Sequence, residues 1–160
     1  MLNASGRNSY VLCEVAAALY AVPSDSIEQL EMIGHITPVP NTAHFVDGVT
    51  SVRGKVLPVV SLRSRFGFPR IAHDLRSRLV VVRWQQRTVA LVVDAAREFA
   101  AIPEDAIQPP PEGLADLSSR YLRGLAHLGD RLVLVLDVGA LFDNSTANVE
   151  HSAALLPASA

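Results

Sequence analysis

The chain of 160 residues carries 14 Lys and Arg against 16 Asp and Glu, and 49% of its residues are apolar. The resulting net charge of −2 gives no general attraction to nucleic acid or to an anionic lipid surface. The apolar residues suffice for a packed core, but no run approaches the ~18 residues of a membrane span, so direct membrane insertion is not expected. A single cysteine, Cys13, excludes an internal disulfide, and the N-terminus lacks the pattern of a signal peptide, so we expect a cytoplasmic protein.

Period-two alternation of apolar and polar residues, rich in β-branched side chains, predicts short strands along most of the chain. In chain order, the expected strands are 9–15, 18–22, 30–37, 48–53, 55–62, 78–84, 87–93, 95–100, 122–128 and 131–137. Gly129-Asp130 and Gln85-Gln86 fit tight connections between neighbouring strands. Strands of this length joined by short turns predict an all-β barrel or sandwich.

Helix is expected only in short pieces. Residues 40–45 and 138–142 can each hold one turn, and residues 143–160 form a tail or a short C-terminal helix. Pro58 lies inside an apolar strand and supplies no backbone N–H, so we expect that strand to be a sheet edge at that point.

An internal repeat organises this pattern. Residues 45–66 align without a gap on residues 121–142, and the aligned pairs include Phe45 with Tyr121, Gly48 with Gly124 and Arg53 with Gly129. More weakly, residues 36–40 parallel residues 107–111, and Tyr20-Ala21-Val22 can be laid on Ala90-Leu91-Val92. Each copy, at roughly 75 residues, is too short to be comfortably stable alone, so two similar halves are expected to share one core.

The motifs that would indicate catalysis or a cofactor fail on inspection. The segment from Gly48 to Lys55 superficially resembles a phosphate-binding loop, but five residues separate its glycines where four are required, and Val56 replaces the Ser or Thr that would hold magnesium. The five histidines have no metal-ligand spacing, and Cys13 lies on an alternating strand without an activating partner. The sequence therefore predicts neither an enzyme nor a metal or cofactor site.

A group of five arginines and one separate arginine suggest functional interpretations. One set, which crowds the segment linking the halves, comprises Arg63, Arg65, Arg70, Arg76 and Arg78. A small β-barrel with such a patch can bind single-stranded nucleic acid, but that mode needs aromatic platforms, and only Phe66, Phe68 and Trp84 lie nearby. Nucleic-acid binding is therefore kept as the alternative function. The second case is Arg53, a charge that only one copy of the repeat carries and that the shared fold does not demand.

Several motifs together carry a family resemblance. They are residues 36–40 (ITPVP), the run 45–67 with Val52-Arg53-Gly54 at its centre, residues 89–94 (VALVVD), residues 107–111 (IQPPP) and residues 122–137. With these motifs, residues 9–142 strongly resemble CheW, the bacterial chemotaxis coupling protein family.

The resemblance implies an all-β fold of two pseudo-symmetric five-stranded SH3-like barrels packed around a shared hydrophobic core. Residues 1–160 would form one CheW-like domain with two intertwined subdomains, approximately 9–66 and 78–142. It also implies a non-enzymatic cytoplasmic adaptor that couples methyl-accepting chemoreceptors to the histidine kinase CheA at the inner face of the membrane. Assembly with other CheW-like domains into rings or arrays would follow.

The resemblance also implies partner-binding residues. Val52-Arg53-Gly54 matches the family's Leu-Arg-Gly turn, whose arginine contributes to receptor and kinase coupling, and Gly48 matches a position linked to kinase binding. Apolar contacts at a groove between the barrels are expected from Ile27, Leu30, Ile33 and Val56.

Two departures from the family pattern affect these expectations. Met32 stands where the family often has a glutamate that faces the turn arginine. The neighbouring Glu31 should point to the opposite face of its strand, so a Glu31–Arg53 ion pair needs a bulge or a shifted register. Ser61 stands where the family usually carries Asp, which would weaken a capping or turn contact.

Overall fold

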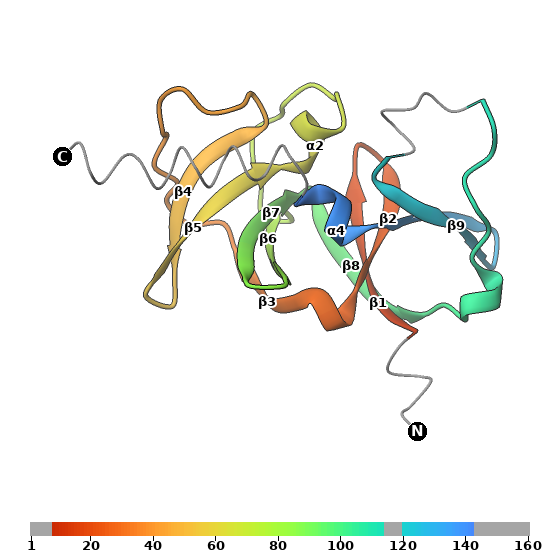
Figure 1. Cartoon of the computed structure of the whole chain (residues 1–160). Coiled ribbons are helices and arrows are strands. Elements are labelled where there is room, and N and C mark those ends of the chain that lie inside the picture. Colours follow the sequence, from red (N-terminus) through yellow and green to blue (C-terminus); the bar gives the residue numbers. More distant parts are fainter. Residues whose placement is uncertain (1–7, 114–119, 143–160) are drawn as a thin grey trace.

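The computed structural model describes residues 8–113 and 120–142, and these residues fold into ten strands and a few short helical turns (Figure 1). In chain order the elements are β1 (Ser9–Val15), β2 (Ala18–Pro23), η1 (Ser24–Ser26), β3 (Ile27–Met32), β4 (Val46–Val52), β5 (Lys55–Ser61), α2 (Leu62–Arg65), β6 (Arg78–Trp84), β7 (Arg87–Val93), β8 (Ala95–Ala101), η2 (Glu104–Ala106), β9 (Leu122–Leu128), β10 (Arg131–Leu136) and α4 (Val138–Leu141). The expected all-β class with few helices is confirmed. Within the described ranges, no helix is long and apolar enough to cross a bilayer.

Two local predictions need correction. The strand expected at 30–37 begins at Ile27 and ends at Met32, and of residues 33–37 only Thr37 forms a bridge, to Val49. A β-bulge between Ile27 and Gln29 breaks the alternation at the start of β3, which lies before the range predicted. Residues 40–45 form turns and no helix, whereas a helical turn that was not predicted, α2, follows β5. The expected turn after Asp137 is α4, and the predicted tail or helix at 143–160 lies outside the described residues.

The strands form two five-stranded mixed sheets. The first sheet has the order β8-β1-β2-β10-β9 and the second has the order β3-β6-β7-β5-β4. Pairing is antiparallel except between β2 and β10 and between β5 and β7. Each sheet contains strands from both halves of the chain. The first sheet combines β1 and β2 with β8, β9 and β10, and the second combines β3, β4 and β5 with β6 and β7.

The repeat is visible in the backbone. A Cβ atom on Gly48 would come closer than 3.0 Å to the Thr37 carbonyl, and one on Gly124 would do the same at the Gln108 carbonyl. Thr37 and Gln108 are themselves aligned in the repeat, and each forms an isolated bridge to the residue after the glycine. Both glycines are therefore required by the same close approach of two backbone segments.

The outer part of the alignment shifts by one residue. In the parallel pairs, Val59 lies opposite Ala90 and Val135 lies opposite Ala21. Because Val59 and Val135 are repeat counterparts, Ala21 corresponds to Ala90, and the alignment of Tyr20 with Ala90 is wrong by one position. Pro58 pairs only with Val49 of β4, since pairing of β5 with β7 starts at Val59, which confirms the expected edge.

The largest apolar cluster lies between the sheets and is shared by them. It includes the buried residues Val11, Cys13, Val80, Val82 and Leu91. A second, smaller cluster lies within the first sheet, and a third lies within the second sheet. Cys13 has no exposed surface, and burial raises the pKa of its thiol to about 12, so it is a neutral core residue at physiological pH.

Candidate partner-binding surface

The β4–β5 hairpin places Arg53 at its tip. Arg53 and Gly54 form the two-residue turn, with φ of 50° and 83°, and positive φ at both positions is the geometry that matches the twist of a hairpin. A non-glycine residue with positive φ costs roughly 1 kcal/mol. The repeat counterpart of Arg53 is Gly129, with φ of 63°. Arg53 therefore adopts an unfavourable backbone conformation at a position where the other half has glycine, and it places a charge there.

Arg53 contacts the strand at the opposite edge of the second sheet. Its Nε donates to Glu31 Oε2 at 3.3 Å, with 75% of the Arg53 side chain and 29% of the Glu31 side chain exposed. The bulge between Ile27 and Gln29 in β3 supplies the irregularity that this pair was expected to need. Exposed ion pairs contribute at most about 1 kcal/mol, so the pair orients Arg53 more than it stabilises the fold.

A groove of about 400 Å³ lies beside this pair, bounded by β3 and by the β4–β5 hairpin. Its lining includes Glu31, Met32, Arg53 and Val56, which we call the hairpin surface. Met32 is 62% exposed and Val56 is 69% exposed, which is unusual for large apolar side chains. Exposed apolar side chains beside an oriented polar pair are typical of a protein-binding site.

The other predicted residues do not all join this surface. Ile27 and Leu30 lie opposite Val82 and Val80, which belong to the core between the sheets. Ile27 packs against that core, whereas Leu30 is 40% exposed at its margin. Both residues can therefore contact a partner only along the border between the sheets.

Two further predicted residues have local structural roles. Ile33 packs against the interior cluster of the second sheet. Gly48 is buried beneath the Thr37–Pro38 backbone, which explains the glycine without any partner contact. Ser61, the departure from the family's Asp, still caps α2, because its hydroxyl accepts the Ser64 N–H at 3.2 Å.

A second surface on the first sheet was missed by sequence reasoning. Leu132, the repeat counterpart of Val56, is 50% exposed. Phe99 of β8 lies opposite Val11, and Leu30 of β3 lies opposite Val80, the counterpart of Val11 in the other sheet. Phe99 is therefore the counterpart of Leu30, and it is 71% exposed. Beside them, Arg131 donates to Glu98 at 3.1 and 3.2 Å, and this bond lowers the pKa of the Glu98 carboxyl. We call Phe99, Leu132, Glu98 and Arg131 the counterpart surface.

The repeat alignment could have identified Leu132, because it aligns this residue with Val56. It could not have identified Phe99, because the equivalence of β3 and β8 depends on how the sheets exchange strands.

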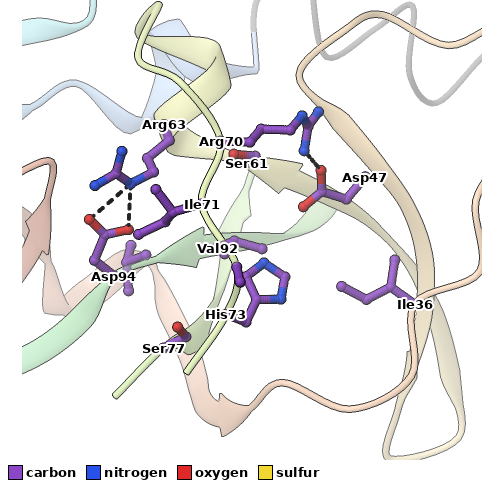
Figure 2. Close-up of a pocket in the computed structure, with 12 residues that line it drawn as sticks. Ile36, Asp47, Ser61, Arg63, Arg70, Ile71, His73, Ser77, Val92 and Asp94 are labelled. Atoms are coloured by element: carbon purple, nitrogen blue, oxygen red, sulfur yellow. Dashed lines mark hydrogen bonds and ion pairs between the residues drawn. The ribbon is translucent and has the colours of Figure 1, made fainter. Parts of the chain in front are cut away.

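The arginines of the linking segment are largely engaged within the protein. Figure 2 shows Arg63 reaching Asp94 and Arg70 reaching Asp47, with Ile71 and His73 between the two pairs. They line a groove of about 350 Å³ in which each of these guanidinium groups faces a carboxylate.

Of the three candidate aromatic platforms, Phe66 stacks on Tyr20 with ring centroids 5.2 Å apart, whereas Phe68 and Trp84 are 38% and 40% exposed. Because Arg63 and Arg70 beside them face carboxylates, the nucleic-acid alternative still receives no support. The part of the chain that the structure describes holds no group of three or more His, Cys, Asp or Glu side chains that could bind a metal ion.

Comparison with known proteins gives a consistent result. The CheW-like domain family matches residues 9–146. Chemotaxis protein CheW of Helicobacter pylori is 36% identical over 120 residues, which are 74% of this chain and 72% of that protein. Chemotaxis protein CheW of Klebsiella aerogenes is 29% identical over 125 residues, covering 78% of this chain and 75% of that protein. The crystal structure of the scaffolding protein TtCheW from Thermoanaerobacter tengcongensis matches with a TM-score of 0.79 and 28% identity, covering 87% of this chain and 90% of that one.

The structural match spans both sheets and identifies them as the two SH3-like subdomains of the CheW fold. CheW scaffolding proteins are non-enzymatic, which agrees with a candidate site made of exposed apolar side chains and ion pairs. The chain belongs to the CheW-like domain family and is a scaffolding protein of chemotaxis signalling.

Proposed function

We propose that this protein is a cytoplasmic adaptor that couples methyl-accepting chemoreceptors to the histidine kinase CheA. Family membership supports the pathway, and the observation that carries the assignment to a surface is the Arg53–Glu31 pair set among Met32 and Val56. A strained turn that presents a charge is typical of a functional position, because the fold alone would prefer glycine there.

Each partner is assigned by the shape and chemistry of its surface. Arg53, Gly54 and Val56 of the hairpin would contact the regulatory domain of CheA, with Gly48 supporting the hairpin from below. A receptor helix would lay apolar side chains along the border between the sheets, where Ile27 and Leu30 lie and Ile33 follows in the chain. The two partners would then occupy neighbouring surfaces in a fixed relative orientation.

The counterpart surface supports assembly with other CheW-like domains into rings or arrays. It carries an ion pair and exposed apolar side chains on the first sheet, as the hairpin surface does on the second. Two similar but non-identical faces on one molecule favour head-to-tail contacts, which close into rings or extend. Individually weak contacts would gain strength through avidity in such an array.

Binding measurements with Arg53→Glu test the proposal. We expect at least about tenfold weaker binding to the CheA regulatory domain or to a receptor tip fragment, since the change reverses a charge and repels Glu31. Arg76→Glu is the matched control, because Arg76 is also an exposed arginine, at 61% of its side chain, but lies away from the hairpin groove. Wild-type affinity of the folded Arg53→Glu protein for both partners would contradict the proposal.

A further inference from the structure

The helical turn α2 differs in one respect from its repeat counterpart α4. Each is capped in the same way, by Ser61 accepting from Ser64 N–H and by Asp137 accepting from Ala140 N–H. The side chains they carry are different, however. Arg63 of α2 corresponds to Gly139 of α4, and Arg65 corresponds to Leu141.

Arg65 lies between equivalent aromatic rings of the two halves. Its guanidinium carbon is 4.5 Å from the ring centroid of Phe45 and 4.4 Å from that of Tyr121. Phe45 precedes β4 of the second sheet, and Tyr121 precedes β9 of the first. Burial is the main cause of a lowered pKa at Arg65, and the aromatic faces compensate the desolvated cation. One arginine thus joins the two sheets through a pair of rings that the repeat makes equivalent.

Arg63 joins the sheets at a second place, through Asp94. Its Nε donates to both carboxylate oxygens of Asp94 at 3.0 and 3.1 Å, an arrangement visible in Figure 2. Asp94 lies where the chain passes from β7 of the second sheet to β8 of the first. Its carboxylate also accepts the Ala16 N–H, at 2.8 Å, in the β1–β2 turn. With 19% of the Arg63 side chain and 13% of the Asp94 side chain exposed, this contact is shielded from solvent.

At α4 the two corresponding positions carry no charge, and the cation that reaches this turn comes from a strand: Arg87 of β7 donates to the Phe142 carbonyl and lies 5.5 Å from the centroid of its ring. A Cβ on Gly139 would lie 2.8 Å from Trp84 Cζ2, so the glycine makes room for an indole from the second sheet. Leu141 is buried in the core between the sheets. Charge-assisted contacts therefore join the sheets at both turns, but only at α2 do the turn's own side chains supply the cations, two of them within three residues.

We propose that α2 is a clamp that fixes the relative orientation of the two sheets, and that Arg63 and Arg65 are positioning residues for coupling. The inference rests on the proposed adaptor function, in which partners contact different parts of one molecule. Binding of the CheA domain to the hairpin surface, which lies on the second sheet, does not require a fixed angle between the sheets. Simultaneous binding of two partners in an assembly does, because avidity is lost when the geometry prevents joint engagement.

Arg65→Leu is the sharpest test, because it gives α2 the residue that α4 already has. Arg65 is partly buried, and replacing a desolvated charge by an apolar residue of similar size is often neutral or stabilising, so the variant should fold. We expect its affinity for the CheA domain alone to stay within about threefold of wild type, because the hairpin surface lies on one sheet. We expect its activation of CheA in the complete receptor assembly to fall by about tenfold or more. Arg65→Lys should restore part of the activation, and Arg76→Leu should match wild type.

A distance measurement tests the clamp without any partner. Ser51 and His127 are exposed repeat counterparts on different sheets, so cysteines at both positions can carry spin labels while buried Cys13 stays unreactive. We expect a narrow inter-label distribution in the otherwise wild-type protein and a broader one with Arg65→Leu or Asp94→Asn. An unchanged distribution in both variants would overturn the clamp, whatever the partners do.

Other outcomes also decide the matter. A broadened distribution with wild-type activation would overturn the positioning role, and loss of affinity for the CheA domain alone in Arg65→Leu would make Arg65 a contact residue instead. Failure of the wild-type protein to bind either partner would refute the adaptor function and leave the distance result standing on its own.

Discussion

Gly48 and Gly124 occupy the same position in the two halves, each beneath the carbonyl of a residue that the repeat also aligns, Thr37 or Gln108. This relationship shows that the sequence repeat is a repeat of backbone packing. It also indicates how a substitution at Gly48 would act: on stability first, and on partners only through the hairpin that it supports.

Gly48→Ala should lower the free energy of unfolding by about 2 kcal/mol or more, because the added Cβ meets backbone atoms that cannot move aside and the φ of 140° disfavours side chains. Chemical denaturation measures this change. Gly34→Ala is the control, since a Cβ there meets nothing within 4 Å. Equal stabilities of the two variants would contradict the packing argument.

Arg53→Gly should separate stability from function. Glycine relieves the positive φ, so the folded state should gain up to about 1 kcal/mol, which corresponds to roughly 2–4 °C in Tm for a chain of this size. Partner binding should weaken, because the charge is gone. Thermal unfolding and binding titrations on one preparation check both effects. A variant that is less stable yet binds as wild type would show that the turn arginine is structural.

Phe99→Ser should leave the fold intact, because the side chain is 71% exposed and exposed substitutions usually change stability by less than about 0.5 kcal/mol. We expect it to reduce assembly with other CheW-like domains by about tenfold, as measured by sedimentation of reconstituted arrays. Binary binding at the hairpin surface serves as the internal control and should not change. Normal array assembly would contradict the proposed role of the counterpart surface in assembly.

Cys13 should report global unfolding. Burial raises the pKa of its thiol from 9.0 to about 12, so the neutral form is favoured in the folded state. This contribution to stability is present below pH 9 and is lost as pH rises from 9 toward 12, because the unfolded chain ionises first. A thiol reagent at pH 8 should therefore modify Cys13 only when the protein unfolds, and modification much faster than unfolding would show an open path to the core.

Much of the fold was predictable because the repeat and the strand alternation are local signals. The alignment of Gly48 with Gly124 indicated two similar halves. The alignment of Arg53 with Gly129 indicated that the arginine has a function that the fold does not require. The family resemblance implied intertwined subdomains, but the strands that are exchanged could not be predicted, since pairing of β2 with β10 depends on contacts remote in sequence. The bulge after Ile27 could not be predicted either. It places Ile27 and Leu30 on the same face of β3, whereas residues three apart on a regular strand lie on opposite faces.

The role of Arg65 was also hidden. In the sequence it is one of five arginines in a linking segment, which suggested either a solvated connector or a basic patch. The alignment pairs Phe45 with Tyr121 but cannot show that both rings contact the same guanidinium group. Only the folded chain brings the cation between them.

The most direct test of the adaptor account is the autophosphorylation rate of CheA reconstituted with receptor-containing membranes. Wild-type protein should raise this rate at least about tenfold over the same mixture without it, Arg53→Glu should leave it near the unassisted level, and Arg76→Glu should behave as wild type. Full activation by the folded Arg53→Glu protein, or no activation by wild type with any chemoreceptor of its host, would contradict the account.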